Sequence, residues 1–197
     1  MTIKQFIEEN DHSNAVILLE GKRVVFEEDQ TKLTQLGQLL ATLSTRMKFR
    51  SGNAEGADYY FSKGVASVDK NRLQVITPYA GHREKSNLAG VTYSLDDINL
   101  AYEHELIRQS KSNKKTANLI DKYVGGKRDR YSIKAAYIIR DTIKVLGSEA
   151  ISAASFGLFY DDILNPKTGG TGHTMHICEK KNIPVIDQHE WFKWLLE

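Results

Sequence analysis

Short apolar runs alternate with amphipathic stretches in the first part of the chain. Residues 15–19, 47–50 and 73–76 form compact runs that end near a glycine or a proline, which is typical of buried strands. Between the first two runs, leucines recur at intervals of three and four residues over 32–44, the spacing of an amphipathic helix. A second helix is expected after residue 57. The pattern therefore predicts an alternating strand–helix order.

The same alternation returns near the end of the chain. Strands are predicted over 153–160 and 183–186, with helices between them and over 191–196. The stretch from about 95 to 147 is polar and helical in pattern, and Gly147 is expected to cap its last helix. The prediction is an α/β, Rossmann-like fold in which helices flank a mostly parallel sheet of about five strands. Residues 95–147 are predicted to be a helical insertion within a single domain spanning 1–197, because they are too polar to hold a core of their own as a second domain.

Composition narrows the classes of function. The 197 residues are 41% hydrophobic, and 27 basic against 25 acidic residues give a net charge of +2. That balance does not favour nucleic acid or an anionic membrane as a partner. The single cysteine, Cys178, excludes an internal disulfide, and no apolar run approaches the roughly 20 residues of a membrane helix. These features predict a cytoplasmic protein without a membrane partner.

Glycine-containing segments follow three of the predicted strands. In a doubly wound sheet, strand ends and helix starts gather along one edge. A helix N-terminus presents unpaired N–H groups and a partial positive charge, and glycine lets the backbone approach a bound phosphate. The predicted ligand-binding residues are Gly21, Arg23, Ser51, Gly52, Asn53, Glu55, Gly56, Asp58, Gly169, Gly170, Thr171, Gly172, His173 and Thr174.

Each segment also has a structural interpretation. Gly21 can be an ordinary turn glycine, and the segment 53–58 can be a tight strand-to-helix joint. Glu55 can cap a helix, and Asp58 can form an internal hydrogen bond instead of contacting a ribose. The segment 169–174 is the hardest to explain structurally, because three glycines in four residues cost backbone entropy. Gly170 and Gly172 are expected to adopt a positive φ angle where the backbone meets phosphate.

Two of these segments resemble a known family. Ser51-Gly52-Asn53-Ala54-Glu55-Gly56-Ala57-Asp58, and Gly169-Gly170-Thr171-Gly172-His173-Thr174 with Ile183-Pro184-Val185 after it, are similar to the two glycine motifs of the SLOG superfamily. That superfamily includes DNA-processing protein A and the Lonely Guy phosphoribohydrolases. The resemblance covers about 15–78 and 153–185. It implies a Rossmann-like fold and a nucleotide-derived ligand held between the two motifs.

The resemblance is incomplete at the position of the hydrolases' catalytic glutamate. Where their spacing expects that residue, this chain has His176, and the nearest carboxylate is Glu179. Cleavage of an N-glycosidic bond usually needs a carboxylate, so Glu179 and the strand-end pair Asp161 and Asp162 are the catalytic candidates.

Two hypotheses about function stay open. The first is a module that binds a phosphate-bearing, nucleotide-derived molecule as a sensor, sequestering protein or carrier. The alternative is an N-glycoside hydrolase acting on a nucleoside monophosphate or an ADP-ribose-like compound. No cofactor is predicted, and His173, His176 and Cys178 do not match a zinc spacing, so no metal is predicted. Nucleic acid is not an expected partner, and a homo-oligomer is retained as a prediction.

Overall fold

Six parallel strands form one sheet at the centre of the molecule. The computed structural model describes residues 1–197, and the strands lie in the order β4-β3-β2-β1-β5-β6. Every neighbouring pair is parallel, so the predicted Rossmann-like α/β architecture is confirmed. The strands are β1 (Val16–Gly21), β2 (Lys48–Ser51), β3 (Leu73–Thr77), β4 (Val91–Ser94), β5 (Phe156–Tyr160) and β6 (Val185–Ile186).

The strand order reverses between β1 and β5. From β1 the chain builds outward through β2, β3 and β4, and after the insertion it returns to pair β5 with the other side of β1. Loops after β1 and β5 therefore leave the sheet in opposite directions and open a crevice at its carboxyl edge. Ligands of open α/β sheets bind at such a switch point.

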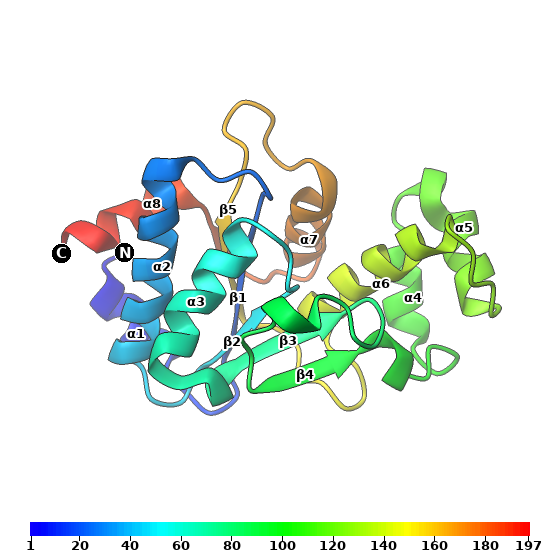
Figure 1. Cartoon of the computed structure of the whole chain (residues 1–197), viewed down its shortest axis with the longest axis horizontal. Helices are drawn as coiled ribbons and strands as arrows, with labels where there is room; N and C mark the ends of the chain where they lie inside the picture. The colour runs from blue at the N-terminus through cyan, green and yellow to red at the C-terminus, as the bar shows by residue number, and fades with distance from the viewer.

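Eight α-helices surround the sheet, and Figure 1 shows α2 and α3 on one side of β1 and β5 and α6 and α7 on the other. None of them combines the length and the apolar character needed to cross a lipid bilayer. The helices are α1 (Ile3–Asn10), α2 (Glu27–Leu43), α3 (Ala57–Asp69), α4 (His104–Ser110), α5 (Lys114–Val124), α6 (Ser132–Leu146), α7 (Gly169–Lys180) and α8 (Gln188–Trp191).

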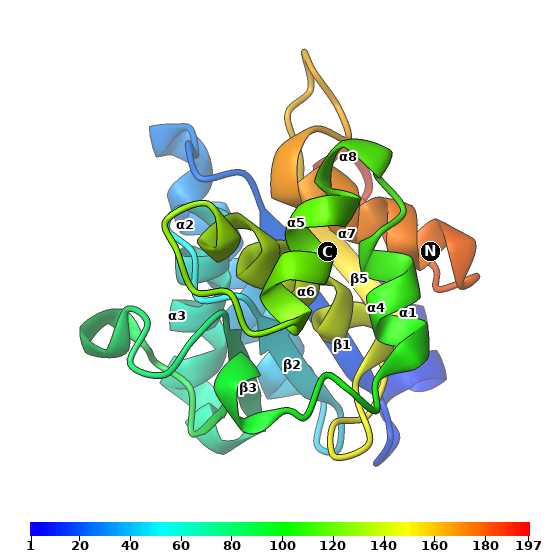
Figure 2. The same cartoon turned by 90° about the vertical axis from the view of Figure 1, so that its right-hand side faces the viewer.

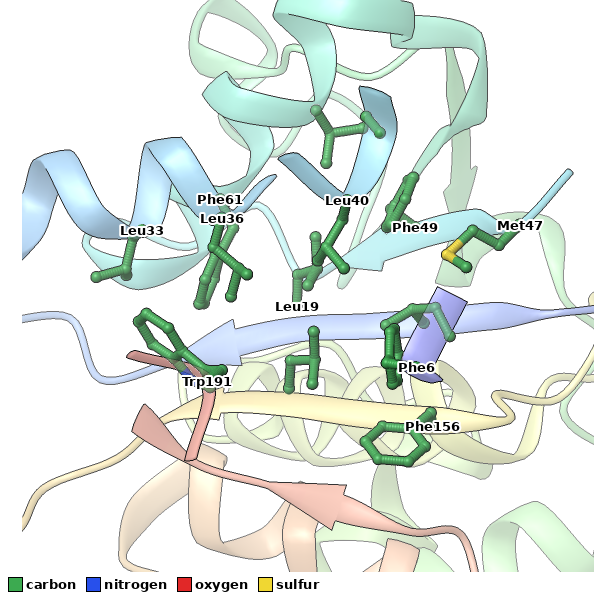
Figure 3. Close-up of a cluster of buried hydrophobic side chains, with 14 of the residues drawn as sticks. Phe6, Leu19, Leu33, Leu36, Leu40, Met47, Phe49, Phe61, Phe156 and Trp191 are labelled. Atoms are coloured by element: carbon green, nitrogen blue, oxygen red, sulfur yellow. The ribbon is translucent and has the colours of Figure 1, made fainter. Parts of the chain in front are cut away.

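Alternate residues of β1 supply two different cores. Ile17 and Leu19 belong to the larger hydrophobic cluster with α2 and α3, whereas Leu18 points to the opposite face and packs with α7. This alternation is the two-residue period of a strand. Figure 3 shows the larger cluster, in which leucines of α2 and Phe61 of α3 approach Leu19 and Trp191. The Trp191 indole Nε1 donates to the Phe159 carbonyl oxygen at 2.9 Å, which fixes the C-terminal helix against β5.

The insertion consists of α4, α5 and α6, and Figure 2 shows these helices gathered beside the sheet. The expectation that it is too polar to hold a core was wrong. Ten buried hydrophobic residues form a cluster that joins all three helices, including Leu106, Ile120 and Ile139, to Ile76 of β3. Many of the charged residues of α4 and α5 are exposed, whereas the polar residues Ser132, Arg140, Asp141, Thr142 and Lys144 of α6 are buried. The insertion is thereby anchored to the sheet that carries the crevice.

One strand was not predicted. β4 raises the total to six, and three of its four residues, Val91, Thr92 and Tyr93, are partly or fully exposed. It lies at one edge of the sheet, so only one of its sides is bonded to a neighbouring strand. A short edge strand lacks the apolar run that identifies the buried strands.

Candidate functional site

The main pocket lies at the carboxyl edge of the sheet, at the switch point between β1 and β5. Its volume is about 620 Å³. The end of β1 and the following Lys22 and Arg23 form one wall, and α5 and α6 of the insertion form another. The first turn of α7 closes the third side with Gly169, Gly170 and Thr171. Sheet, insertion and α7 therefore meet at one cavity.

The first turn of α7 presents free backbone donors to this pocket. The preceding residue, Thr168, makes no side-chain capping bond, and Gly172 supplies the first amide that is bonded, to the Thr168 carbonyl oxygen. The amides of Gly169, Gly170 and Thr171 are left without an acceptor in the chain. The N-terminal partial charge of a twelve-residue helix favours an anion at this position.

Basic side chains line the same cavity. The residues that line the pocket include five lysines and arginines and three carboxylates. Lys22 and Arg23 come from the end of β1, and Lys134, Arg140 and Lys144 come from α6. The net positive lining and the free amides of α7 together make the pocket suited to an anionic ligand.

A second pocket, with a volume of about 600 Å³, lies beside the first. Arg23 lines both pockets, and Glu55, Gly56 and Arg83 line only the second. Arg83 pairs with Glu55 at 2.5 Å, and the Arg83 guanidinium lowers the pKa of that carboxyl. Glu55 makes no helix-capping bond, since α3 has no side-chain cap, and it stays largely exposed.

Asp58 organises the floor of the main pocket. Its Oδ1 accepts from the Gly21 amide at 3.3 Å, and its Oδ2 accepts from the amides of Gly52 and Ala54 at 3.0 and 3.3 Å. The side chain is buried, and both of its oxygens are engaged. Of the two interpretations drawn from the sequence, the internal hydrogen bond is the one present. The carboxylate ties the end of β1 to the loop between β2 and α3.

A buried network of four charged side chains continues from this floor. The Lys144 ammonium lies 2.7 Å from Glu20 Oε2 and 2.8 Å from Asp141 Oδ1, and Arg140 Nε lies 3.0 Å from Asp141 Oδ1. Arg140 also donates to the Gly52 carbonyl oxygen. All four side chains are at most 7% exposed. Buried charges of this kind are costly unless they are paired, so the network is tightly constrained.

Neighbouring charges set the protonation of this network. Burial opposes the charge of Lys144, but Asp141 and Glu20 outweigh it and raise the pKa of the lysine. Burial likewise raises the pKa of Asp141, but Arg140 and Lys144 outweigh it, so that the pKa lies below its usual value. Both groups are therefore ionised at neutral pH.

Glu20 behaves differently from the other members. Its Oε1 is buried and has no hydrogen-bond partner, although Oε2 is paired with Lys144. Burial, aided by the nearby charges of Asp58 and Asp141, raises the pKa of Glu20 to about 7 in spite of Lys144. A pocket-lining carboxyl that titrates near neutrality is a frequent property of functional sites.

The sequence analysis did not single out Glu20, Lys144 or the pair Arg140–Asp141. All four residues line the pocket, and all four are buried. A signal was present in the chain. Glu20 interrupts the end of an otherwise apolar strand, and Arg140, Asp141 and Lys144 lie among the buried residues of α6.

The predicted glycine-segment residues separate into four groups. The main pocket is lined by Gly21, Arg23, Asp58, Gly169, Gly170, Thr171 and His173. Ser51 ends β2, and Gly52 and Asn53 begin the loop after it; all three are buried and do not line the pocket. Asn53 has a positive φ of 56°, and its Nδ2 donates to the carbonyl oxygens of His82 and Arg83. Glu55 and Gly56 face the second pocket.

Gly172 and Thr174 are buried inside α7 and do not line the pocket. The segment 169–174 is the start of the helix itself, and Gly169 is its only residue with a positive φ, at 62°. The expected positive φ at Gly170 and Gly172 was therefore wrong. A side chain at Gly172 would overlap the Lys167 carbonyl group, and Thr174 Oγ1 donates to the Gly170 carbonyl oxygen at 3.1 Å. Close packing of the helix explains both residues.

Replacing Gly172 with alanine should destabilise the fold without affecting a bound ligand. The added methyl group would collide with backbone, and overpacking of this kind costs roughly 1–3 kcal/mol. Gly125→Ala is the matched control, because Gly125 has a negative φ and more room, so its change should stay near 0.5 kcal/mol. Urea unfolding of both variants measures the difference. Equal stabilities would contradict this packing role of Gly172.

The three catalytic candidates taken from the sequence lie outside the pocket. Glu179 is exposed and pairs with Lys167. Asp161 Oδ2 accepts from the Lys167 amide at 2.7 Å, and Asp162 Oδ1 accepts from the Leu164 amide at 3.0 Å. The two aspartates accept hydrogen bonds from backbone amides of the loop between β5 and α7 and so stabilise that loop. Their role in the structure is therefore the structural one, not the catalytic one.

His173 faces the main pocket from α7. Its Nε2 lies 3.3 Å from Thr142 Oγ1, and burial lowers the pKa of the imidazole. His176 is exposed on the same helix, and burial raises the pKa of the Cys178 thiol to about 12. No three histidine, cysteine or carboxylate side chains come together in a way that would hold a metal ion.

Comparisons with known proteins add no relative. A scan against protein-family models and searches of curated proteins and of solved structures find no match to this chain.

Proposed function

We propose that the protein binds a phosphate-bearing, nucleotide-derived small molecule in the pocket at the switch point. The observation that carries the proposal is the free N-terminus of α7, which opens onto the same cavity as Lys22, Arg23 and Arg140. Unpaired amides and a helix dipole bind phosphate, and arginine adds bidentate contacts. Arg140 Nε makes no hydrogen bond, although it lies 3.0 Å from Asp141 Oδ1 in an ion pair.

The rest of the pocket supports a ligand larger than inorganic phosphate. A volume of about 620 Å³ lies within the range of roughly 300–1,000 Å³ typical of small-molecule and cofactor sites. Tyr137 and Ile138 of α6 offer an aromatic and an apolar surface to a base. Glu20 offers an acceptor for a sugar hydroxyl through its unpartnered oxygen. Phosphate, sugar and base thus each have a matching group.

The resemblance of the two glycine motifs to the SLOG superfamily supports the same proposal. In this chain the first motif forms the pocket floor through Asp58, and the second forms the start of α7. We include membership of that superfamily in the proposal. A role in binding nucleic acid is disfavoured by the near-neutral net charge of +2.

Titration with a panel of anions tests the proposal. AMP, ADP, NAD and ADP-ribose are expected to raise the melting temperature of the protein, with inorganic phosphate as the minimal ligand. A ligand at a hundredfold excess over its Kd stabilises the folded state by about 2.7 kcal/mol. A double variant, Lys22→Gln with Arg23→Gln, should show a smaller rise in melting temperature with each nucleotide. Lys63→Gln, on the exposed face of α3, should show the same rise as the wild type. No shift with any nucleotide would refute the proposal.

A further inference from the structure

We propose that the ligand is a dinucleotide, whose second nucleoside unit occupies the second pocket and whose linking phosphate is bound by Arg23 and Arg83. The inference rests on the proposed function, because the first unit of such a ligand lies in the main pocket. The second pocket then has an occupant of stated chemistry, a nucleobase with its sugar. Its lining residues come from the loop after β1, from the start of α3 and from the segment between β3 and β4.

The two pockets meet at Arg23, which lines both of them. Their volumes are about 620 and 600 Å³, and each falls within the range of roughly 300–1,000 Å³ typical of a small-molecule site. The loop after β1 packs closely on the start of α3, where a side chain at Gly56 would overlap the Arg23 carbonyl group. This contact fixes the Arg23 backbone between the pockets. Each pocket has room for one nucleoside unit of a ligand that passes Arg23.

Positive charge gathers where the pockets meet. Burial lowers the pKa of the His82 imidazole, and three guanidinium groups lower it further. They belong to Arg140, Arg83 and Arg23. Arg83 is paired with Glu55, whereas Arg23 has no carboxylate within ion-pair distance. Arginine binds phosphate through two parallel hydrogen bonds, so this surplus of guanidinium groups is suited to a phosphate that joins two nucleoside units.

The Arg83 side chain has hydrogen-bonding capacity left for such a phosphate. Its Nε is buried without a hydrogen-bond partner, and its Nη1 donates to Glu55 at 2.5 Å. Asn53 Nδ2 donates to the carbonyl oxygens of His82 and Arg83, both at 3.3 Å, and so positions this arginine. A buried donor without an acceptor is costly, and a phosphate oxygen would supply the acceptor. The Glu55 carboxylate is largely exposed, so a phosphate would displace it at little cost.

The aromatic lining of the second pocket favours a nucleobase over a second free phosphate. Tyr59 and Tyr60 of α3 line it, with ring centroids 5.5 Å apart and planes at 73°. The Tyr59 side chain is 38% exposed and makes no hydrogen bond that would be lost on stacking. Val24 and Val25 add apolar surface. Bases stack on aromatic side chains whatever their identity, so this pocket can hold the second base as Tyr137 holds the first.

Calorimetric titration of the whole chain with three adenine ligands tests the proposal. The ligands are AMP, a 5′-phosphorylated diadenylate with a 3′–5′ link, and diadenosine diphosphate with a 5′–5′ link. Joining two units makes the binding of the second one intramolecular, which raises the affinity without any new contact. At least one of the two dinucleotides is expected to bind tenfold or more tightly than AMP, with one molecule per chain. The tighter of the two identifies the linkage that the protein recognises.

Variants of the second pocket assign this gain to its residues. Arg83→Gln and Tyr59→Ala should each weaken dinucleotide binding by tenfold or more and change the affinity for AMP less than threefold. Tyr59→Phe should bind like the wild type, because it keeps the ring. Glu55→Gln should bind the dinucleotide more tightly, because it frees Arg83. Lys85→Gln is the control, since Lys85 is exposed and lines neither pocket.

Retained AMP binding shows that each variant is folded. Dinucleotides that bind no more tightly than AMP would overturn the inference and leave the proposed function standing. Equal losses for AMP and dinucleotide in Arg83→Gln and Tyr59→Ala would have the same consequence. Absence of binding by AMP and by both dinucleotides in the wild type would overturn the inference and the proposed function together.

Discussion

Replacing Lys144 with methionine is expected to lower the free energy of unfolding by about 3–5 kcal/mol, the cost of removing one partner from a buried ion pair. The variant would leave Glu20 and Asp141 buried beside each other without the ammonium that lies between them. Methionine keeps most of the length and the apolar stem, so the lost charge dominates the effect. Urea unfolding at pH 8 measures it.

The loss in Lys144→Met should be smaller at pH 5 than at pH 8. Without the lysine, the pKa of Glu20 rises further above its unfolded value of about 4.5, since Lys144 is the group that lowers it. A carboxyl with a raised pKa contributes stability below its unfolded pKa and loses it as the pH rises through the folded value. At pH 5 the protonation of Glu20 therefore offsets part of the loss in the free energy of unfolding.

Lys180→Met is the matched control for this experiment. Lys180 is exposed in the last turn of α7, so its replacement should change stability by no more than about 0.5 kcal/mol. If Lys144→Met were as stable as the control at pH 8, the buried network would not be held together by its charges.

Replacing Asp58 with alanine is expected to destabilise the protein by at least about 3 kcal/mol. Three backbone amides would lose their acceptor, the buried amide of Gly52 and the part-buried amides of Gly21 and Ala54, and an unsatisfied buried donor costs about 1–3 kcal/mol. The loop after β2 would also lose its link to β1. Thermal unfolding with calorimetry measures the loss.

Glu55→Ala serves as the comparison for Asp58→Ala. Glu55 belongs to the same loop, but its carboxylate is largely exposed and contacts only Arg83. Surface pairs of this kind contribute about 0–1 kcal/mol. Similar losses in the two variants would show that Asp58 does not organise the pocket floor.

The sequence predicted those parts of the fold in which local pattern and tertiary environment agree. Residues 15–19 form an unbroken apolar run because β1 is covered on both faces, and the leucines of α2 repeat because one face of that helix packs on the sheet. β4 lies at an edge of the sheet and has no unbroken apolar run, so the pattern did not predict it. The core of the insertion escaped prediction because its apolar residues are spread over three short helices.

The candidate site was only partly predictable for a similar reason. Glycine segments mark helix starts, and the pattern placed Gly169 and Gly170 at one of them. Glu20 and Lys144 are 124 positions apart, so no local pattern can pair a strand-end carboxyl with a lysine of α6. Gly172 shows the converse, because a glycine required by helix packing has the same local signature as one that approaches a ligand.

The Thr171→Glu variant offers the most direct test that a phosphate binds at the start of α7. Thr171 lines the pocket within the first turn of that helix, where a carboxylate interacts favourably with the helix dipole. The fold should therefore stay intact while the new negative charge occupies the phosphate position. Thr171→Gln, of the same size without the charge, is the matched control.

Calorimetric titration of wild type, Thr171→Gln and Thr171→Glu with AMP and ADP-ribose, beside their melting temperatures, decides the matter. The predicted result is that nucleotide binding is lost in Thr171→Glu, is retained in Thr171→Gln, and that the melting temperatures of all three are equal or highest in Thr171→Glu. A folded Thr171→Glu protein that binds nucleotide as tightly as the wild type would contradict the account.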